Sequence, residues 1–208
     1  MPMSVPQPDE ELLAAWSAGD TSAGDRLFVR HFAAIDRFFV NKAARGEVGD
    51  LVQRTFMICV ERAHTFASRA SFRAFLLGIA RNVLRDHYRA MTKGRRNVGE
   101  VSVADLSPGP SAVFAKREEQ RLLLHALRSV PIDAQVILEL YYWEELTGVE
   151  IAEILGVPEN TARTRLRRAR LRVARELERL ADSPGLLDST QGDLEKWARS
   201  LRPSPTTG

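Results

Sequence analysis

The fold is decided by residues 147–180, which read TGVEIAEILGVPENTARTRLRRARLRVARELERL. Thr147 followed three positions later by Glu150 is a capping-box signature, which marks the start of a helix. The GVP run at 156–158 ends that helix, and a second helix begins near Glu159. The stretch therefore predicts a helix, a tight turn and a second helix.

The second of these helices separates an apolar stripe from arginine-rich faces. Its stripe recurs at three- and four-residue steps, the spacing of one helix face, and consists of Ala162, Leu166, Ala169, Val173, Leu177 and Leu180. A helix anchored on one side and cationic on the other suits insertion into the DNA major groove. A solvated basic helix is the alternative. The turn and the basic helix occur together, which favours DNA binding.

Composition limits the remaining possibilities. The chain has 208 residues, 44% of them hydrophobic, and a formal net charge of only +3, so its positive charge is local. A single cysteine, Cys59, excludes an intramolecular disulfide and indicates a buried thiol in a reducing compartment. No apolar run approaches the roughly 20 residues that span a bilayer. We therefore expect a soluble cytoplasmic protein with no membrane insertion.

The chain shows no useful period-two alternation, so we expect an all-α protein. Two small helical domains are predicted, joined by a flexible linker rich in Gly, Pro and Ser. The expected parts are a disordered lead (1–8), the first domain (9–91), the linker (92–112), the second domain (113–181) and a C-terminal extension with one short helix (182–208).

The last helix of the first domain, predicted from Phe72 to about Arg89 with Ser71 as its cap, also divides by face. Its apolar face carries Phe72, Phe75, Leu76, Ile79 and Val83, and its other face carries Ala74, Gly78, Arg81, Asn82, Arg85 and Arg89. Small residues beside arginines let a phosphate approach closely, although an ordinary solvated face fits equally well. The preceding loop, 64–69, either cradles an extruded base or simply connects two helices.

Two segments carry a resemblance to a known family. Residues 49–89, with the runs DLVQRTF and FRAFLLGIARNVLRDHYR, look like domain two of bacterial RNA polymerase sigma factors. Residues 130–170 resemble sigma domain four. Two domains in this order with only a short linker are similar to the extracytoplasmic-function group. The resemblance implies a sigma factor that binds core RNA polymerase and directs transcription initiation at a specific set of promoters.

The resemblance also implies roles for individual residues. Those implied to contact the polymerase β′ clamp are Asp50, Leu51, Gln53, Arg54 and Phe56. Those implied to read the promoter −10 element are Arg81, Asn82, Arg85, Arg89, Phe66 and Arg69. Those implied to read the −35 element are Asn160, Arg163, Thr164, Arg165, Arg167 and Arg168. The β flap is a second implied contact on the polymerase, and an anti-sigma factor is a further candidate partner.

No catalytic or metal-binding pattern is present. The four histidines are scattered without zinc spacing, and no phosphate-cradling glycine loop or nucleophile elbow occurs. Acidic pairs such as Glu144-Glu145 fit solvated helix faces. We expect a protein that is not an enzyme, needs no cofactor and is monomeric when free. The alternatives are a stand-alone helix-turn-helix regulator and a protein–protein adaptor whose basic helix binds an acidic partner.

Overall fold

The computed structural model describes residues 7–63, 71–92, 101–103, 118–192 and 196. Apart from one isolated β-bridge between Ser102 and Pro131, the regular structure of these residues is helical, so the all-α prediction is confirmed. The helices are α1 (Asp9–Ser17), α2 (Thr21–Val40), α3 (Val48–Arg62), α4 (Phe72–Met91), α6 (Glu118–Ser129), α7 (Ile132–Tyr142), α8 (Gly148–Leu155), α9 (Glu159–Leu180) and α10 (Pro184–Gly192).

The first four helices form the first domain, and side-chain caps set where two of them begin. The carboxylate of Asp20 accepts hydrogen bonds from the backbone N–H groups of Ser22 and Ala23 at the start of α2. The hydroxyl of Ser71 accepts one from the backbone N–H of Ala74 at the start of α4, as the sequence predicts. These caps satisfy backbone donors that a helix start leaves unpaired.

The helix-turn-helix of α8 and α9 forms as its sequence predicts. The hydroxyl of Thr147 accepts from the backbone N–H of Glu150, and the Glu150 carboxylate accepts from that of Thr147, completing the capping box. Gly156 ends α8 at a φ of 64°, the left-handed conformation that glycine adopts most easily. On the predicted stripe of α9, four side chains are buried, and Leu166 and Leu180 are half-buried.

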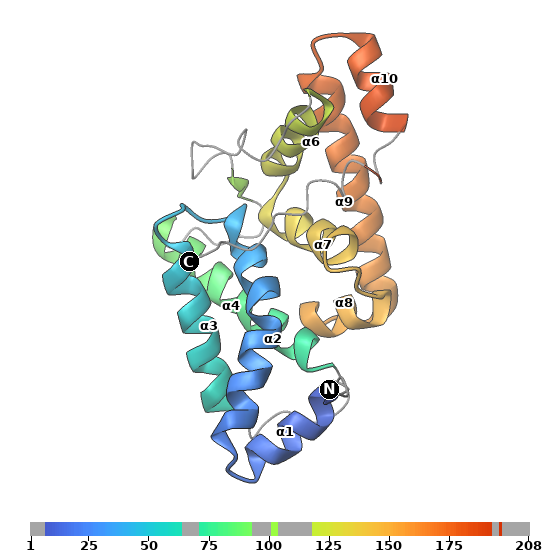
Figure 1. Ribbon diagram of the computed structural model, residues 1–208. Coiled ribbons are helices and arrows are strands. Elements are labelled where there is room, and N and C mark those ends of the chain that lie inside the picture. The colour runs from blue at the N-terminus through green and yellow to red at the C-terminus, as the bar shows by residue number, and fades with distance from the viewer. Residues whose placement is uncertain (1–6, 64–70, 93–100, 104–117, 193–195, 197–208) are drawn as a thin grey trace, which may run out of the picture.

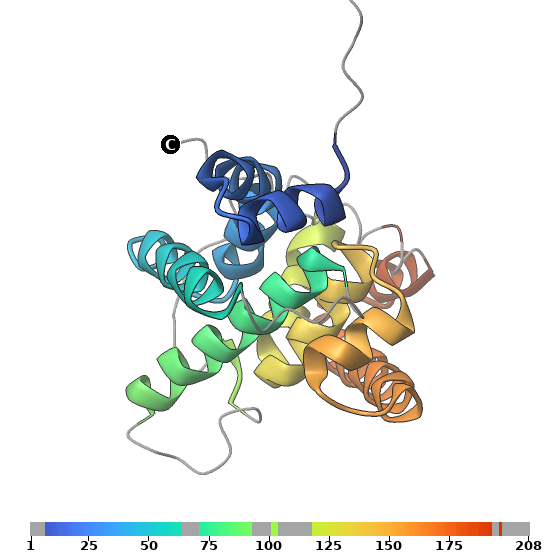
Figure 2. The ribbon, with the colours of Figure 1, turned by 90° about the horizontal axis from the view of Figure 1, so that it is seen from below.

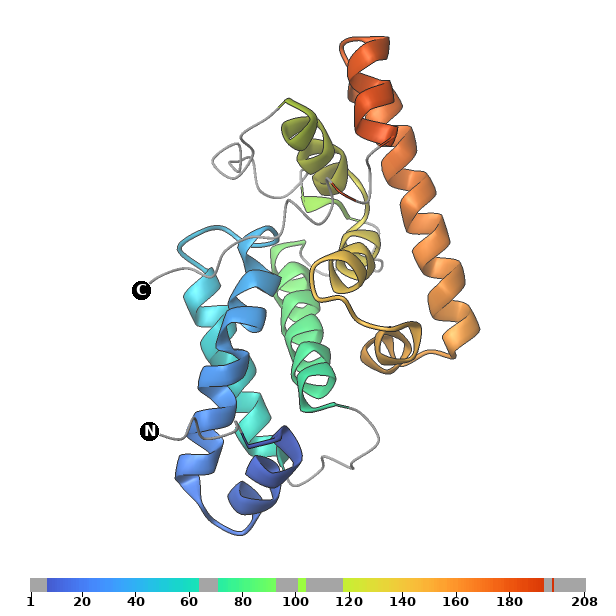
Figure 3. The ribbon, with the colours of Figure 1, turned by 45° about the vertical axis from the view of Figure 1, so that its right-hand side comes forward.

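Helix α4 lies in the middle of the molecule. Helices α2 and α3 pack against it from the first domain, and α8 packs against it from the second. Figures 1 and 3 show α4 between these layers, with α9 on the outer side of the second domain. The view from below in Figure 2 shows the same order. The two helices that the sequence predicts as DNA readers therefore sit in different environments.

Part of the predicted linker is held against the second domain. Val101 accepts a hydrogen bond through its carbonyl from the backbone N–H of Ile132 at 2.9 Å, and the side chain of Val103 is buried. Within the C-terminal extension the structure describes helix α10, which packs against α6 and α9. The predicted disordered lead lies almost wholly outside the described residues. Among the helices that the structure describes, none is both long and apolar enough to cross a bilayer.

Candidate functional surfaces

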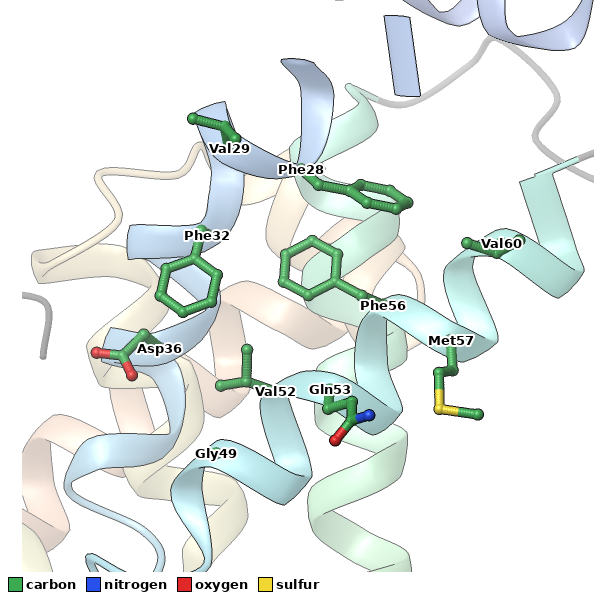
Figure 4. Close-up of a pocket in the computed structure, with 10 residues that line it drawn as sticks. All are labelled: Phe28, Val29, Phe32, Asp36, Gly49, Val52, Gln53, Phe56, Met57 and Val60. Carbon is green, nitrogen blue, oxygen red and sulfur yellow. The ribbon is translucent and has the colours of Figure 1, made fainter. Parts of the chain in front are cut away.

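An open apolar groove runs between α2 and α3. Its volume is about 670 Å³, and Figure 4 shows its walls, which include Phe28, Val29, Phe32, Val52, Phe56, Met57 and Val60. Phe56 fills the centre, with its ring centroid 4.9 Å from that of Phe28 and 6.2 Å from that of Phe32. Met57 and Val60 are 57% and 52% exposed. An exposed apolar groove of this kind is a candidate binding surface for another macromolecule.

The predicted polymerase contacts surround this groove unevenly. Asp50, Gln53 and Arg54 are exposed on α3, and Phe56 is half-buried in the groove. Leu51 is buried among the core side chains, so it supports the α3 surface from beneath rather than forming it.

Sequence reasoning missed the apolar part of this surface. Phe32 is 45% exposed, because α2 carries apolar side chains over a wider arc than the core covers. Val29, Met57 and Val60 were not singled out at all. The sequence pattern that could have identified these residues is a pair of apolar residues one turn apart, outside the core stripe, on each of two neighbouring amphipathic helices.

The predicted −35 residues all lie on the exposed side of α9. These are Asn160, Arg163, Thr164, Arg165, Arg167 and Arg168. Arg163 is paired with Glu159 one turn earlier, with an N–O distance of 2.7 Å. The hydroxyl of Thr164 donates to the backbone carbonyl of Asn160. The four guanidinium groups are spread over the exposed arc of the helix outside its apolar stripe, where they are suited to contacts with phosphates and base edges.

The predicted −10 residues on α4 do not share one accessible face. Asn82 and Arg89 are exposed and Arg85 is half-buried, but Arg81 is only 7% exposed. Arg89 is paired with Asp86, with an N–O distance of 2.8 Å. Phe66 and Arg69 lie outside the described residues.

The second domain packs against α4, so the predicted division of this helix into an apolar face and an open polar face is wrong in part. Ala74 was placed on the polar side, yet it is buried, because α8 of the second domain packs against α4. Burial lowers the pKa of the Arg81 guanidinium; Asp133 of α7 opposes this shift, whereas Arg85 and Arg165 add to it. Arg81 therefore faces charged groups of the second domain rather than solvent.

Buried ion pairs join the two domains beside α4. The Nε and Nη2 atoms of Arg37 on α2 lie 2.8 Å and 3.1 Å from the two carboxylate oxygens of Glu144. Arg73, in the first turn of α4, pairs with the same carboxylate. Burial raises the pKa of Glu144, but the hydrogen bonds and charges of Arg37 and Arg73 outweigh it and hold the pKa below its ordinary value. Glu144 was expected to be solvated, so that prediction is wrong.

A second buried pair lies next to the first. Lys42, whose side chain is 0% exposed, pairs with Glu139 of α7, which also accepts a hydrogen bond from Gln135 at 2.7 Å. Burial lowers the pKa of Lys42 and raises that of Glu139, and each partner opposes the other's shift. No local pattern predicted these pairs, because the partners lie about a hundred residues apart in the chain.

The described residues hold no group of three or more His, Cys, Asp or Glu side chains that could bind a metal ion. Cys59 is buried as predicted, and burial raises the pKa of its thiol to about 12, so the thiol is protonated and unreactive at neutral pH. What the described side chains present is one apolar groove, one exposed cationic helix and one covered cationic helix.

Two family models match the chain. Residues 27–94 match sigma-70 region 2, and residues 120–173 match sigma-70 region 4. Together they account for more than half of the 208 residues. The first match contains the groove and α4, and the second contains α7, α8 and most of α9.

Individual relatives agree with these matches. A probable RNA polymerase sigma factor RfaY of Xanthomonas campestris pv. campestris is 32% identical over 62% of this chain. This chain spans about a third (33%) of that relative's length. The ECF RNA polymerase sigma-E factor of Haemophilus influenzae is 24% identical over 83% of this chain and 96% of its own. The solved structure of CnrH in complex with the cytosolic domain of CnrY is 24% identical in sequence to this chain. The match covers 84% of this chain and 99% of that chain, with a TM-score of 0.61, so the two share a fold.

Proposed function

The chain belongs to the sigma-70 family as a sigma factor of the extracytoplasmic-function type that directs promoter-specific transcription initiation, and from this premise we propose which of its surfaces bind polymerase and which bind the promoter. The groove between α2 and α3 binds the β′ clamp of core RNA polymerase. Helix α9 binds the −35 element, and α4 binds the −10 element. The observation that carries this assignment is the exposed apolar groove.

Several features support the groove as the polymerase site. Exposed apolar side chains of α2 and α3 line it together, and exposed polar side chains of α3, those of Asp50, Gln53 and Arg54, border it. An apolar centre with a polar rim is the usual anatomy of a protein–protein interface. Phe56 and Phe32 are rigid aromatic side chains of the kind that dominate binding energy at such centres.

The DNA assignments rest on α9 and α4. The six predicted −35 residues of α9 are accessible together, and the N-terminal half of the second helix of a helix-turn-helix is the part that contacts base edges. On α4, Asn82 and Arg89 are exposed beside Arg85, and an amide flanked by guanidinium groups suits base and phosphate contacts. Phe66 and Arg69 remain proposed contacts of the opened strand.

Other parts of the assignment follow the family. Sigma factors act in the cytoplasm with RNA polymerase and promoter DNA and are not known as enzymes. The β flap is proposed as the contact of the second domain, and an anti-sigma factor is proposed as a partner that competes with polymerase. The free protein is proposed to be monomeric.

Run-off transcription tests the proposed function directly. Purified bacterial core RNA polymerase is supplied with genomic fragments, with and without the protein. Discrete transcripts that depend on the protein are expected, and their start sites define both promoter elements. Tight DNA binding without polymerase, and no new transcript with it, would instead establish the stand-alone regulator.

The groove is tested separately by placing a charge at its exposed edge. Met57→Glu buries a carboxylate when a partner covers the groove, so polymerase affinity is expected to fall at least tenfold. Glu61→Gln, an exposed change on the same helix, serves as the control. Unchanged polymerase affinity of the Met57 variant, measured by fluorescence anisotropy, would remove the groove from the interface.

A further inference from the structure

Three cationic side chains of the first domain lie beside α4 at its boundary with the second domain. Arg37 comes from the last turns of α2, Lys42 follows that helix, and Arg73 lies in the first turn of α4. Their charges meet Glu139 and Glu144 of the second domain. Charged groups are buried only when they are paired, and here the second domain supplies the two carboxylates that pair with the cations.

The same place has the features of a site for phosphate oxygens. Arg37 holds both carboxylate oxygens of Glu144 at 2.8 Å and 3.1 Å, and a guanidinium grips carboxylates and phosphates in this same two-point way. Arg73 stands at the N-terminal end of α4, where the helix dipole also favours an anion. Glu139 and Glu144, whose charges act on Lys42, both belong to the second domain. Separation of the domains would leave these three cations without their neutralising charges.

We propose that Arg37, Lys42 and Arg73 bind the phosphodiester backbone of promoter DNA, and that Glu139 and Glu144 occupy the same cations while the chain is closed. This rests on the proposed promoter binding of the first domain. The closed chain therefore blocks itself: the carboxylates fill the phosphate site, and the second domain covers Arg81 on the −10 helix. Moving the second domain away uncovers both at once.

The first test uses the free chain. Phosphate contacts are independent of base sequence, so a fluorescein-labelled oligothymidylate strand is a sufficient probe. Glu144→Gln is expected to bind this strand about tenfold more tightly than the original chain, and its radius of gyration by small-angle scattering is expected to increase. Glu11→Gln removes the same charge from an exposed position on α1 and is expected to change the affinity less than about twofold. Unchanged affinity and unchanged size in Glu144→Gln would overturn the proposal.

A second variant keeps this test decisive if Glu144→Gln does not fold. The triple swap Arg37→Glu, Arg73→Glu and Glu144→Arg places one guanidinium between two carboxylates, which is the original arrangement with its charges reversed. The swapped chain is expected to recover the compact radius of gyration, whereas Arg37→Glu alone is expected to stay extended. An extended swapped chain with normal helical circular dichroism would show that these charges do not close the domains.

The second test uses the complex with core polymerase on a promoter mapped by run-off transcription. Arg37→Gln and Arg73→Gln are each expected to lower the slope of log affinity against log salt by about 0.7–0.9, the value of one phosphate contact. Arg26→Gln, an exposed arginine of α2, is expected to leave the slope unchanged. An unchanged slope in both variants would overturn the proposal, as would a loss of polymerase affinity instead, because the cations would then meet an acidic surface of polymerase. If the original complex gives no promoter-dependent transcript, the proposed function itself fails and this inference with it.

Discussion

Helices α4 and α9 look alike in the sequence and differ in the folded protein. Both combine an apolar stripe with arginines on the remaining faces, and both were predicted to present those arginines to DNA. On α9 the arginines from 163 to 168 are exposed, whereas on α4 Arg81 is covered by the second domain. A helix can therefore carry the residues of a binding surface while another part of the same chain occupies that surface.

Part of this difference in exposure follows from the apolar residues that lie outside the apolar stripe of each helix. Helix α4 also carries Leu77, Ala80 and Leu84, which lie beside its assigned apolar face and are fully buried. Helix α9 has one large apolar residue away from its stripe, Leu171, and it is 52% exposed. A helix that is apolar nearly all round is packed on both sides, and a helix with a single stripe is packed on one.

The largest expected effect is on the free energy of unfolding, when one leucine from each helix is replaced by alanine. Leu77→Ala leaves a cavity where α4 is enclosed, so the free energy of unfolding is expected to fall by about 2–5 kcal/mol. Leu171→Ala removes an exposed side chain and is expected to change it by less than about 0.5 kcal/mol. Urea denaturation followed by circular dichroism measures both. Equal losses would mean that the two helices are packed to the same degree.

The next effect compares one arginine from each helix in DNA binding by the free chain. Arg167→Gln is expected to lower affinity for a DNA duplex about tenfold, because the side chain is exposed on the proposed −35 face. Arg81→Gln is expected to change it little, because the second domain covers that side of α4. Fluorescence anisotropy measures the two affinities.

The complex with polymerase provides the control for this pair. There the first domain must reach the promoter, so Arg81→Gln is expected to weaken promoter binding as clearly as Arg167→Gln does. If Arg81→Gln leaves DNA affinity unchanged in both the free chain and the complex, Arg81 does not read the promoter, and its burial is purely structural.

A smaller effect concerns the charges that hold the second domain over α4. The pKa of Glu144 is lowered in the folded chain, so its contribution to stability is present above its ordinary value of 4.5 and is lost as the pH falls through the folded pKa. The melting temperature of the original chain is therefore expected to drop more steeply between about pH 6 and pH 3 than that of Glu144→Gln. Burial and the Glu144 charge both raise the pKa of Glu139, so its opposite shift is smaller in Glu144→Gln and reduces the expected difference.

Much of the fold could be predicted from the sequence, because the deciding signals are local. The capping box of Thr147 and Glu150, the turn at Gly156 and the cap at Ser71 each act within four residues, and all are present. The exposed face of α9 follows from the same helical spacing. The groove was only half predicted: Gln53 and Phe56 came from the resemblance, but Met57 did not.

The closed arrangement could not be predicted, for a physical reason. Arg37 and Glu144 are 107 residues apart, and each looks like an ordinary surface charge beside its sequence neighbours. Their burial depends on how two domains pack, which helical periodicity does not encode. The same limit explains why Ala74 and Arg81 were assigned to an open face.

The smallest effect compares two glycines, one from α4 and one from the turn before α9. Gly156 has a φ of 64°, so Gly156→Ala forces a side chain into the left-handed region and is expected to cost about 1 kcal/mol. Gly78 has ordinary helical geometry, and a Cβ built there meets nothing within 4 Å. Gly78→Ala is therefore expected to stabilise α4 by about 0.5–1 kcal/mol, measured by thermal denaturation. A loss of stability at position 78 would mean that the second domain lies closer to α4 there than the structure places it, and the cover over the −10 helix would then extend along a further turn.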